Sequence, residues 1–471
     1  MKKMANQVQS AFYKRLMFLL ATTQLLLIVD ASIVNVIVPT IARELSFSET
    51  GQSWIVNAYL TVFGGTLLVS GRIADLMGRT RIFQLGLLVL AIGSAVCALA
   101  HSSELLIVGR AAQGLGSAFA AAASLALILA SFKGEQRYKA LGLLAAMGGL
   151  GGALGTFLGG ALTEWFGWRS TFWLSVVIPL GLLMLSPAIF LNLVDDQRRG
   201  KVDALGAALL MIGQSLLAFG IISFGESARL SDWVWIAGIT CSFLILIIFG
   251  LWQRKAPVPL IAPQTWRNIG LMEALVYSGV GQLIIFPMFF VGNLYLQNTL
   301  KFSPMASGAS FLPLCGVVIL TATNAPSWLR FGEIKALAAG FVLLTMGMLW
   351  LSQAKVDGNF LTDVLGPTLL VGASLPIIAI SSNILGAKNA STGQEGLVSG
   401  LLNTFQQFGA VIGLAAMVSL ASFYSEKLKN DPDSRAELTM LGGYQAAFLM
   451  GAIIALIAAL VLIARSLRKP G

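Results

Sequence analysis

Runs of about 20 consecutive apolar residues recur along the whole chain, and each is long enough to cross the hydrocarbon core of a bilayer. Inside lipid, every backbone N–H and C=O group needs a partner within the protein, which leaves α-helices or a closed β-barrel. The runs are longer than barrel strands and lack their alternation of apolar and polar residues. With only 11% charged residues, the chain is predicted to be an all-α membrane protein.

Fourteen segments are predicted to cross the membrane as helices. The net charge of +10 is spread over short loops between them and forms no basic face, so no nucleic-acid partner is expected. Three isolated cysteines inside apolar runs make neither a disulfide framework nor a metal site. The predicted helices are 16–41, 51–74, 81–100, 104–132, 137–163, 169–192, 202–224, 232–252, 270–297, 304–325, 335–354, 361–387, 393–424 and 441–465.

The distribution of Lys and Arg orients these segments, because cytoplasmic loops of membrane proteins are enriched in both residues. With the N-terminus inside, 22 of the 31 Lys and Arg residues fall on the cytoplasmic side, 8 fall outside and Arg110 lies within a span. The sequence thus predicts a multi-pass protein of the bacterial inner membrane with both termini cytoplasmic. No small-residue cleavage site precedes the first span, so no removable signal peptide is expected.

Two polar or proline-rich breaks, at 193–201 and 253–269, bracket two of the predicted helices and leave six on either side. The predicted organisation is a six-helix bundle over 1–192, a linker with two additional helices over 193–269, and a second six-helix bundle over 270–471. GRIADLMGR follows the second span, and the related SWLRFG follows the tenth, which is the matching place in the second half. Repeated bundles that flank a midplane site are common among transporters.

Asp30 is the clearest candidate for chemistry, since it lies about 15 residues beyond Arg15, or roughly 22 Å along the helix. An ionisable group near the middle of the bilayer is costly and marks a functional site by default. Burial favours its neutral form and a nearby cation its charged form, so such a carboxyl can bind and release a proton. Arg110 lies at a similar depth and is a candidate partner, with Gln113 one turn away. The alternative interpretation is structural: a carboxyl paired within the bundle and an arginine bound to carbonyls.

The short turn from Gly71 to Arg81 holds one acid and three arginines. Asp75 can pair with an arginine or a helix N-terminus, and a conformational latch needs such a breakable contact. The predicted latch residues are Gly71, Arg72, Asp75, Gly78 and Arg79. The alternative is a positive loop that only fixes topology.

Glycines recur every four residues in the fifth span, where the chain reads GGLGGALGTFLGGAL from Gly148. Small residues on one stripe let helices approach closely. The contact could be static or could slide during a conformational change, and the sequence leaves both open.

Amides and aromatic rings are grouped in two later spans, and they are typical of a wet cavity within a helical bundle. They are Gln282, Phe286, Phe290, Asn293 and Gln297 in the ninth span and Asn403, Gln406 and Gln407 in the thirteenth. The alternative is that the rings face lipid or neighbouring helices. Four other polar residues near span ends are interpreted as interfacial: His101, Asp203, Glu273 and Glu395.

Five motifs occur in order along the chain: DASIVNVIVP at 30–39, WIVNAY at 54–59, GRIADLMGR at 71–79, Arg110 with Gln113, Gly114 and Gly116, and YLQ at 295–297 before Ser303-Pro304. Through them the chain resembles the major facilitator superfamily, and within it the fourteen-span drug:proton antiporters. The resemblance implies two six-helix bundles with two extra helices, and alternating access. It also implies proton coupling through Asp30 and Arg110 and a latch around Asp75.

The antiporter-type motif of the fifth helix is matched by Gly151, Gly155, Thr156, Gly159 and Gly160. It departs from the family pattern, because Thr156 replaces a proline that follows the glycine. A threonine can bend a helix by bonding back to a carbonyl.

The predicted function is proton-coupled export of hydrophobic small molecules, cationic ones included. One alternative is a facilitator or proton-coupled transporter of a specific metabolite, and another is a membrane receptor or assembly partner that transports nothing. No P-loop, metal-ligand spacing or nucleophile motif is found, so no enzyme activity, cofactor or metal is expected. A monomer is expected, with substrate, protons and lipid as partners. The residues predicted to line the substrate cavity are Asn35, Asn57, Tyr59, Gln113, Gln282, Phe286, Asn293, Asn403 and Gln406.

Overall fold

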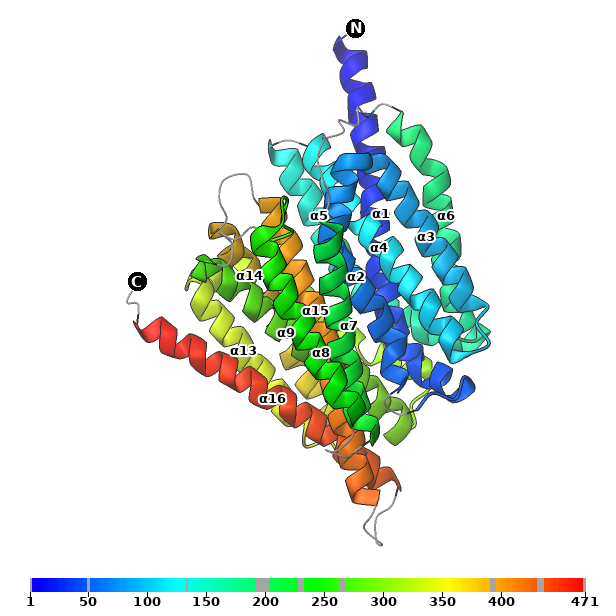
Figure 1. Ribbon diagram of the computed structural model, residues 1–471, viewed down its shortest axis with the longest axis vertical. Helices are drawn as coiled ribbons and strands as arrows, with labels where there is room; N and C mark the ends of the chain where they lie inside the picture. The colour runs from blue at the N-terminus through cyan, green and yellow to red at the C-terminus, as the bar shows by residue number, and fades with distance from the viewer. Residues whose placement is uncertain are drawn as a thin grey trace.

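The computed structural model describes residues 2–48, 51–132, 134–191, 193, 203–227, 233–261, 267–389, 395–429 and 436–468. Within these residues the regular structure is entirely helical, as the apolar runs predict. Figure 1 shows long helices that run roughly side by side in two groups, and the groups converge toward the end of the molecule farthest from the N-terminus. We refer to the opposite end, where the first helix begins, as the N-terminal end.

Six helices form the first half of the chain and lie together in Figure 1, from blue to cyan-green. They are α1 (Lys2–Glu44), α2 (Trp54–Met77), α3 (Arg79–Ala98), α4 (Ser103–Ser131), α5 (Gly134–Phe166) and α6 (Arg169–Phe190), with a 3₁₀ turn η1 (Gly51–Ser53) before α2. Glycines bring α3 and α4 into backbone contact. A Cβ on Gly86 would lie 2.5 Å from the amide nitrogen of Ala120, and one on Gly93 would lie 2.6 Å from that of Gln113. This close packing fixes the depth of the polar residues on α4.

The second half of the chain contains broken as well as continuous helices. They are α9 (Ile269–Leu294), the π-helical turn η3 (Tyr295–Thr299), α10 (Pro304–Ala309), α11 (Leu312–Thr323), α12 (Ala325–Leu329), α13 (Glu333–Leu351), the π-helical turn η4 (Phe360–Leu365), α14 (Gly366–Lys388), α15 (Glu395–Lys429) and α16 (Ala436–Arg468). Several breaks coincide with proline, which removes a backbone donor and starts a new helix readily. The predicted span at 304–325 is therefore divided between α10 and α11.

The two extra helices, α7 (Ala204–Ser227) and α8 (Trp233–Lys255), pair with each other and lie between the halves at the front of Figure 1. α7 packs on α2 from the first half and on α15 from the second. A Cβ on Gly65 of α2 would lie 3.0 Å from Cβ of Met211, and the Ser419 hydroxyl of α15 donates to the carbonyl of Ile221 at 2.8 Å. The pair thus covers one side of the seam between the halves.

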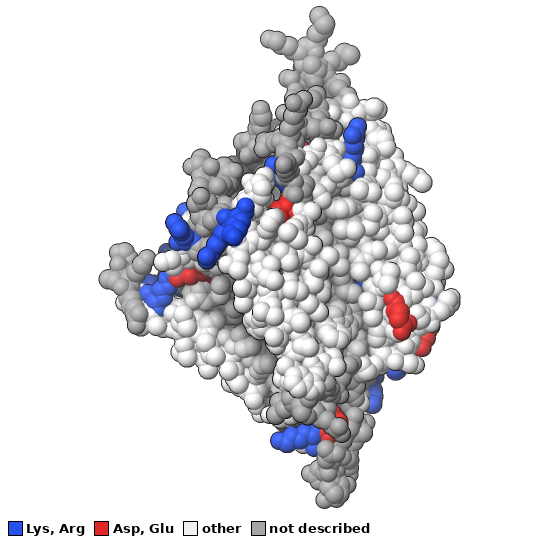
Figure 2. Space-filling model, in the orientation of Figure 1, with Lys and Arg blue, Asp and Glu red and all other residues white. Residues whose placement is uncertain are grey.

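Twelve helices in the described part of the chain are long and apolar enough to cross a membrane, or thirteen if α2, bent by 54°, is counted as one broken span. All fourteen predicted segments overlap helical residues, and α5 is a helix of 33 residues. The prediction of fourteen spans is nevertheless not confirmed, since α5 is not among those that meet the criterion. On the face shown in Figure 2, charged side chains lie mostly near the margins of the view and leave a broad uncharged area between them.

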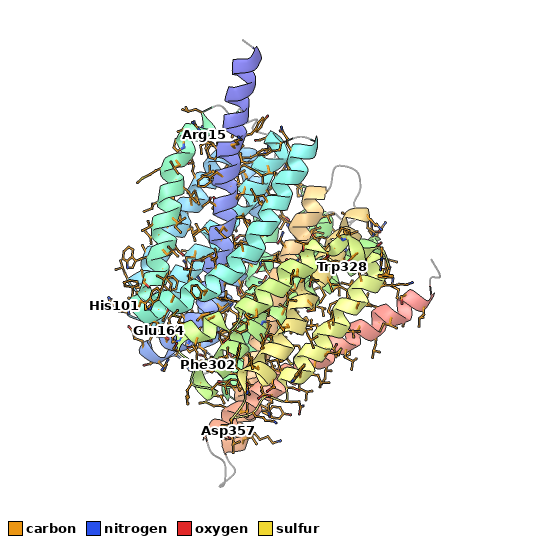
Figure 3. The ribbon with its side chains drawn as sticks, turned by 180° about the vertical axis from the view of Figure 1, so that it is seen from behind. Arg15, His101, Glu164, Phe302, Trp328 and Asp357 are labelled. Carbon is orange, nitrogen blue, oxygen red and sulfur yellow. The ribbon has the colours of Figure 1, made fainter. Side chains whose placement is uncertain are left out.

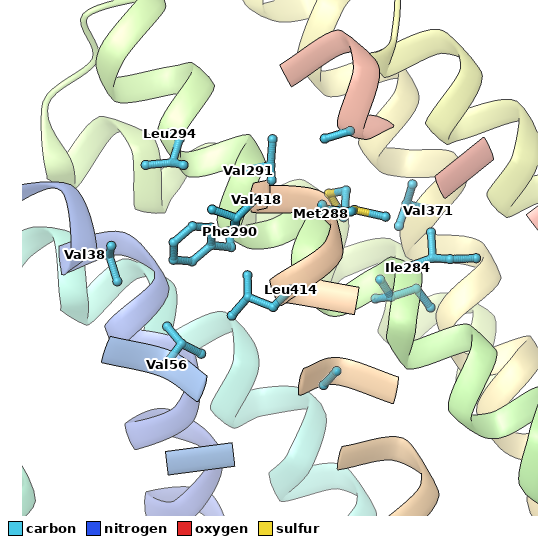
Figure 4. Packing of buried hydrophobic residues seen from close by; sticks show 14 of the residues in the cluster. Val38, Val56, Ile284, Met288, Phe290, Val291, Leu294, Val371, Leu414 and Val418 are labelled. Carbon is cyan, nitrogen blue, oxygen red and sulfur yellow. The ribbon is translucent and has the colours of Figure 1, made fainter. Parts of the chain in front are cut away.

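The largest hydrophobic core joins the two halves at the end away from the N-terminus. Val38 of α1 and Val56 of α2 lie in one cluster with Phe290 of α9 and Leu414 of α15, and Figure 4 shows these side chains within one packed group. A second cluster is confined to the first half, around Leu16 and Phe83. The halves are therefore joined by apolar packing at this end, and a further cluster brings Val69 of α2 together with Leu402 of α15.

Candidate functional site: a buried ion pair beside a central cavity

Asp30 of α1 and Arg110 of α4 meet in the middle of the first half, and both are fully buried. Nη1 of Arg110 lies 3.5 Å from Oδ2 of Asp30. The other carboxylate oxygen, Oδ1, accepts a hydrogen bond from the Ser175 hydroxyl of α6 at 2.7 Å and one from Nε2 of Gln113 at 3.2 Å. Two helices besides α1, namely α4 and α6, therefore hold this carboxylate. 

Besides the carboxylate of Asp30, Arg110 contacts a backbone carbonyl, a side-chain amide and an aromatic ring. Its Nε donates to the backbone carbonyl of Ile55 on α2 at 2.9 Å, and its Nη1 donates to Oε1 of Gln113 at 2.7 Å. Its guanidinium carbon lies 4.6 Å from the centre of the Tyr59 ring. Gln113 also donates to the Ser94 hydroxyl of α3 at 2.7 Å. A cation this deep is tolerable only with a counter-charge and hydrogen bonds, and the site supplies both.

The glycine-bounded turn between α2 and α3 holds an ion pair of its own. Nη2 and Nε of Arg79 donate to Oδ1 of Asp75 at 2.9 and 3.0 Å. Between them Gly78 has φ +104°, a backbone conformation that a side chain would strain. The pair is partly exposed, and Gly71, Arg72, Asp75 and Arg79 border the mouth of the central cavity described below. The Asp75–Arg79 ion pair is thus placed where a change in the shape of the cavity mouth would stretch or break it.

The glycines of α5 make contacts in two directions. A Cβ on Gly151, Gly155 or Gly159 would lie 2.8–2.9 Å from atoms of α1, so this stripe packs α5 on α1. On Gly160 it would overlap the carbonyl of Pro304 in α10, in the other half of the molecule, and on Gly308 of α10 it would overlap the carbonyl of Thr156. The Thr156 hydroxyl donates back to the carbonyl of Gly152 at 3.1 Å. The motif thus lies at a contact between the halves.

A cavity of about 1880 Å³ lies between the halves. It reaches the N-terminal end of the bundle, where Arg72, Asp75 and Arg79 border it. Of the nine residues predicted to line it, six do so: Asn35, Tyr59, Gln282, Phe286, Asn403 and Gln406. The other three do not. Gln113 belongs to the ion-pair cluster, Asn293 is fully buried against Ser307, which donates to it at 2.6 Å, and Asn57 is fully buried elsewhere on α2.

The halves are in direct contact at the end opposite the cavity mouth. Nε2 of Gln297 donates to the carbonyl of Val36 at 2.8 Å, linking η3 to α1. The amide of Met305 donates to Glu164 at 3.3 Å, linking α10 to α5. Figure 3 shows Glu164 and Phe302 toward that same end, and Arg15 at the N-terminal end. The cavity is accordingly open toward the N-terminal end and closed at the other.

Asp203 was predicted to be interfacial, and this prediction is wrong, because its carboxylate is buried on the cavity wall. It accepts hydrogen bonds from the amide of Gly206 at 2.8 Å, Nε1 of Trp252 at 2.7 Å and Nε2 of Gln253 at 2.7 Å. It begins α7 as a helix cap, which places an anion at a helix N-terminus. Glu273 is half-buried and pairs with Arg465, His101 is exposed near a helix end, and the side chain of Glu395 lies outside the described residues.

Several residues of the site were not predicted. Ser94 and Ser175 bind the buried cluster, and Gln24, Phe63 and Phe289 line the cavity. Single serines occur throughout membrane helices, so the sequence gives no signal that separates these two from the rest. Gln24 lies six residues before Asp30 in an apolar run, and that isolated amide was the one available signal.

The fold, the cavity between its halves and the buried ion pair define a polytopic helical membrane protein of the transporter type. The chain belongs to the Major Facilitator Superfamily, whose family model matches residues 20–414. It is 32% identical to the cephamycin export protein CmcT of Amycolatopsis lactamdurans over 85% of this chain and 84% of that protein. It is 30% identical to the puromycin resistance protein pur8 of Streptomyces alboniger over 85% of this chain and 80% of that protein.

Among solved structures, an auto-inhibited peptide transporter of the POT family superposes with a TM-score of 0.72 at 13% identity, covering 97% of this chain and 98% of that one. At this identity the likeness concerns the fold alone. The family and these relatives are transporters rather than enzymes, in keeping with the sequence prediction at the level of the family.

Proposed function

We propose that the protein exports hydrophobic small molecules by alternating access, in exchange for protons that bind at Asp30. The observation that carries this proposal is the placement of the Asp30–Arg110 pair, fully buried and joined through the Tyr59 ring to the wall of the central cavity. A carboxylate whose charge is balanced by one cation and two hydrogen-bond donors can be neutralised by a proton. Neutralisation would remove the attraction that holds Arg110 toward α1.

The direction of export follows from the orientation of the chain. The positive-inside distribution of Lys and Arg supports a cytoplasmic position for the N-terminal end, where the cavity is open. In this conformation a substrate enters from the cytoplasm. Release on the far side requires the Gln297–Val36 and Gly160–Pro304 contacts to part and the mouth near Asp75 to close. Asp75 and Arg79 are then a latch of the kind predicted from sequence.

The relatives favour drugs as the substrates. One is named for cephamycin export and another for puromycin resistance, so we propose antibiotic or multidrug efflux for this chain. We further propose that α2 and α5 also cross the bilayer, which gives fourteen spans in a bacterial inner membrane with both termini cytoplasmic. The chain would belong to the fourteen-span drug:proton antiporters and act as a monomer, because each half contributes to one central cavity.

A facilitator that carries a specific metabolite is the second candidate, and Thr156 favours it. The antiporter-type motif has a proline at this position, whereas here α5 continues unbroken and Thr156 only bonds back to Gly152. A helix without the proline bend can still rock as a unit. A facilitator would need no proton on Asp30.

Tolerance to antibiotics in a bacterial host lacking its own drug pumps tests the proposal. Expression of the wild-type chain should raise the tolerated concentration of puromycin several-fold, and Asp30→Asn should abolish the gain at equal membrane abundance. Collapse of the proton gradient with an ionophore should restore drug accumulation. Export that persists in Asp30→Asn or in the presence of the ionophore would favour the facilitator.

A further inference from the structure

Among the described residues on the wall of the central cavity, charge lies only near the mouth. Among the residues that the structure describes there, the charged ones are Arg72, Asp75, Arg79 and Asp203. Asp75 is paired with Arg79, and the Asp203 carboxylate accepts three hydrogen bonds. The stretch of α5 from 140 to 163, part of whose side chains lie outside the described residues, contains no charged residue in its sequence.

The one charged pair at mid-depth does not reach the cavity. Asp30 and Arg110 are fully buried and neither lines it. Tyr59 stands between Arg110 and the cavity, with its ring 4.6 Å from the guanidinium and stacked on Phe63 at 5.7 Å. A cation bound over these rings would therefore compete with a cation already in place. Asp30 is engaged by Arg110, Gln113 and Ser175, so it offers no free counter-charge.

The cavity does carry hydrogen-bonding groups from both halves. They are Gln24 and Asn35 of α1, Gln282 of α9, and Asn403, Gln406 and Gln407 of α15. An amide offers both donors and an acceptor, so it can bind a carbonyl, hydroxyl or amide of a ligand without a charge. Oδ1 of Asn35 is buried and has no hydrogen-bond partner, and such a group gains stability when a ligand supplies a donor. Phe63, Phe286 and Phe289 add flat apolar surface.

We infer that the cavity selects uncharged aromatic or apolar molecules that carry hydrogen-bonding groups, and that it disfavours permanent ions of either sign. An ion that enters loses hydration and meets no opposite charge, which is costly in an apolar surrounding. A neutral ligand loses only hydrogen bonds that the amides replace. The inference narrows the proposed export function, on which it rests, and departs from the expectation that cations are included.

Three phenyl-substituted probes test this charge selection: triphenylphosphine oxide, which is neutral with a strong acceptor, and the tetraphenylphosphonium cation and tetraphenylborate anion, which are matched to each other in size. Their binding to the purified full-length protein in detergent is measured by equilibrium dialysis. Partition into micelles is subtracted with protein-free micelles at the same detergent concentration. The oxide should bind at least tenfold more tightly than either ion.

A matched pair of variants at Gln282 tests the cause of the selection. Gln282→Glu places a carboxylate on the cavity wall and should raise tetraphenylphosphonium affinity at least tenfold, whereas Gln282→Leu should weaken the oxide and leave the cation unbound. The inference is overturned if an ion binds the wild type as tightly as the oxide, if the oxide shows no binding above that to protein-free micelles, or if Gln282→Glu leaves the order unchanged. If size-exclusion chromatography shows that Gln282→Glu does not fold, the order of the three probe affinities for the wild type decides the inference.

Different results would contradict the proposed function and this inference. The binding order is measured without a proton gradient, so it does not depend on proton coupling. A working proton-driven exporter that prefers the cation contradicts the charge selection alone. A neutral-selective cavity in a chain that does not export contradicts the proposed function alone.

Discussion

The two halves of the molecule share a helical plan but differ in how they use polar residues. The first half holds a buried ion pair, Asp30 with Arg110, and the partly exposed pair of Asp75 with Arg79. In the second half, the described residues on the cavity wall are neutral, and its amides Gln282, Asn403 and Gln406 face the same space. On the described cavity wall, charge lies in the first half and at Asp203 of α7, whereas most of the amides come from the second half. Under the proposed function, the proton would bind in the first half and much of the substrate contact would come from the second.

The turns after α2 and α12 have a similar backbone conformation but carry different ion pairs. Gly78 and Gly332 both have positive φ, +104° and +93°, and each directly precedes a long helix. After Gly78 comes Arg79, paired with Asp75 four residues before it, whereas after Gly332 comes Glu333, paired with Lys388 of α14. The repeated geometry therefore carries opposite charges, and only the first turn borders the cavity with its ion pair.

Removal of one buried charge should give the largest loss of stability. Arg110→Met leaves Asp30 buried without its cation, which typically costs about 3–5 kcal/mol. The double variant Asp30→Asn/Arg110→Met should recover most of that loss. Thermal unfolding in detergent, followed by tryptophan fluorescence, measures both. A single variant as stable as the wild type would mean that the pair carries no charge in this conformation.

Separation of the halves at their glycine contact should have an intermediate effect. Gly160→Val overlaps the backbone of Pro304, and overpacking of this kind costs about 1–3 kcal/mol. Gly152→Val is the control on the same helix, because its side chain points into the cavity and meets nothing within 4 Å. Equal unfolding temperatures for the two variants would contradict the close contact between α5 and α10.

Loss of one neutral amide in the second half should lower the stability by less than Arg110→Met or Gly160→Val. Gln406 donates to the Ser278 hydroxyl at 2.8 Å, and Gln406→Leu removes that bond at about 1 kcal/mol. Proton binding should be unchanged, because no charge is involved. A loss comparable to that of Arg110→Met would erase the distinction drawn between the halves.

The smallest effect on stability is expected at the mouth of the cavity. Asp75→Asn removes an ion pair spaced by four residues and partly exposed, which is worth about 0.3–0.5 kcal/mol. Transport should fall by more than this small change explains if the pair is a latch. Transport rates of Asp75→Asn in proteoliposomes, compared with its unfolding temperature, separate a latch from a loop that only fixes topology.

The helices and the buried charges could be predicted because exposing an unpaired backbone group or an unpaired charge to lipid costs a large free energy. Apolar runs of span length and two charges at similar depth are visible in the sequence, and the structure places Asp30 beside Arg110. The sequence did not show which face of each helix points toward the inside of the protein. In a membrane helix that is apolar all round, no periodicity shows which side faces inward, so Asn57 and Asn293 were assigned to a cavity that they do not line.

Asp203 shows a second limit. Its position near a span end is typical of an interfacial residue, but Trp252 and Gln253 close over it from α8, which lies about fifty residues further along the chain. That contact depends on how α7 and α8 pair. Likewise, Ser94 and Ser175 join the buried cluster only because α4 and α6 pack on α1 and α3 packs on α4.

Proton release on substrate binding tests the central claim most directly. Purified wild-type protein and Asp30→Asn are mixed, in weakly buffered detergent, with the antibiotic to which the chain confers tolerance, and the pH change is recorded with Asp75→Asn as the control. The account predicts that the wild type and Asp75→Asn release protons and that Asp30→Asn binds the antibiotic without releasing any. Equal release from Asp30→Asn would contradict proton coupling through this carboxylate.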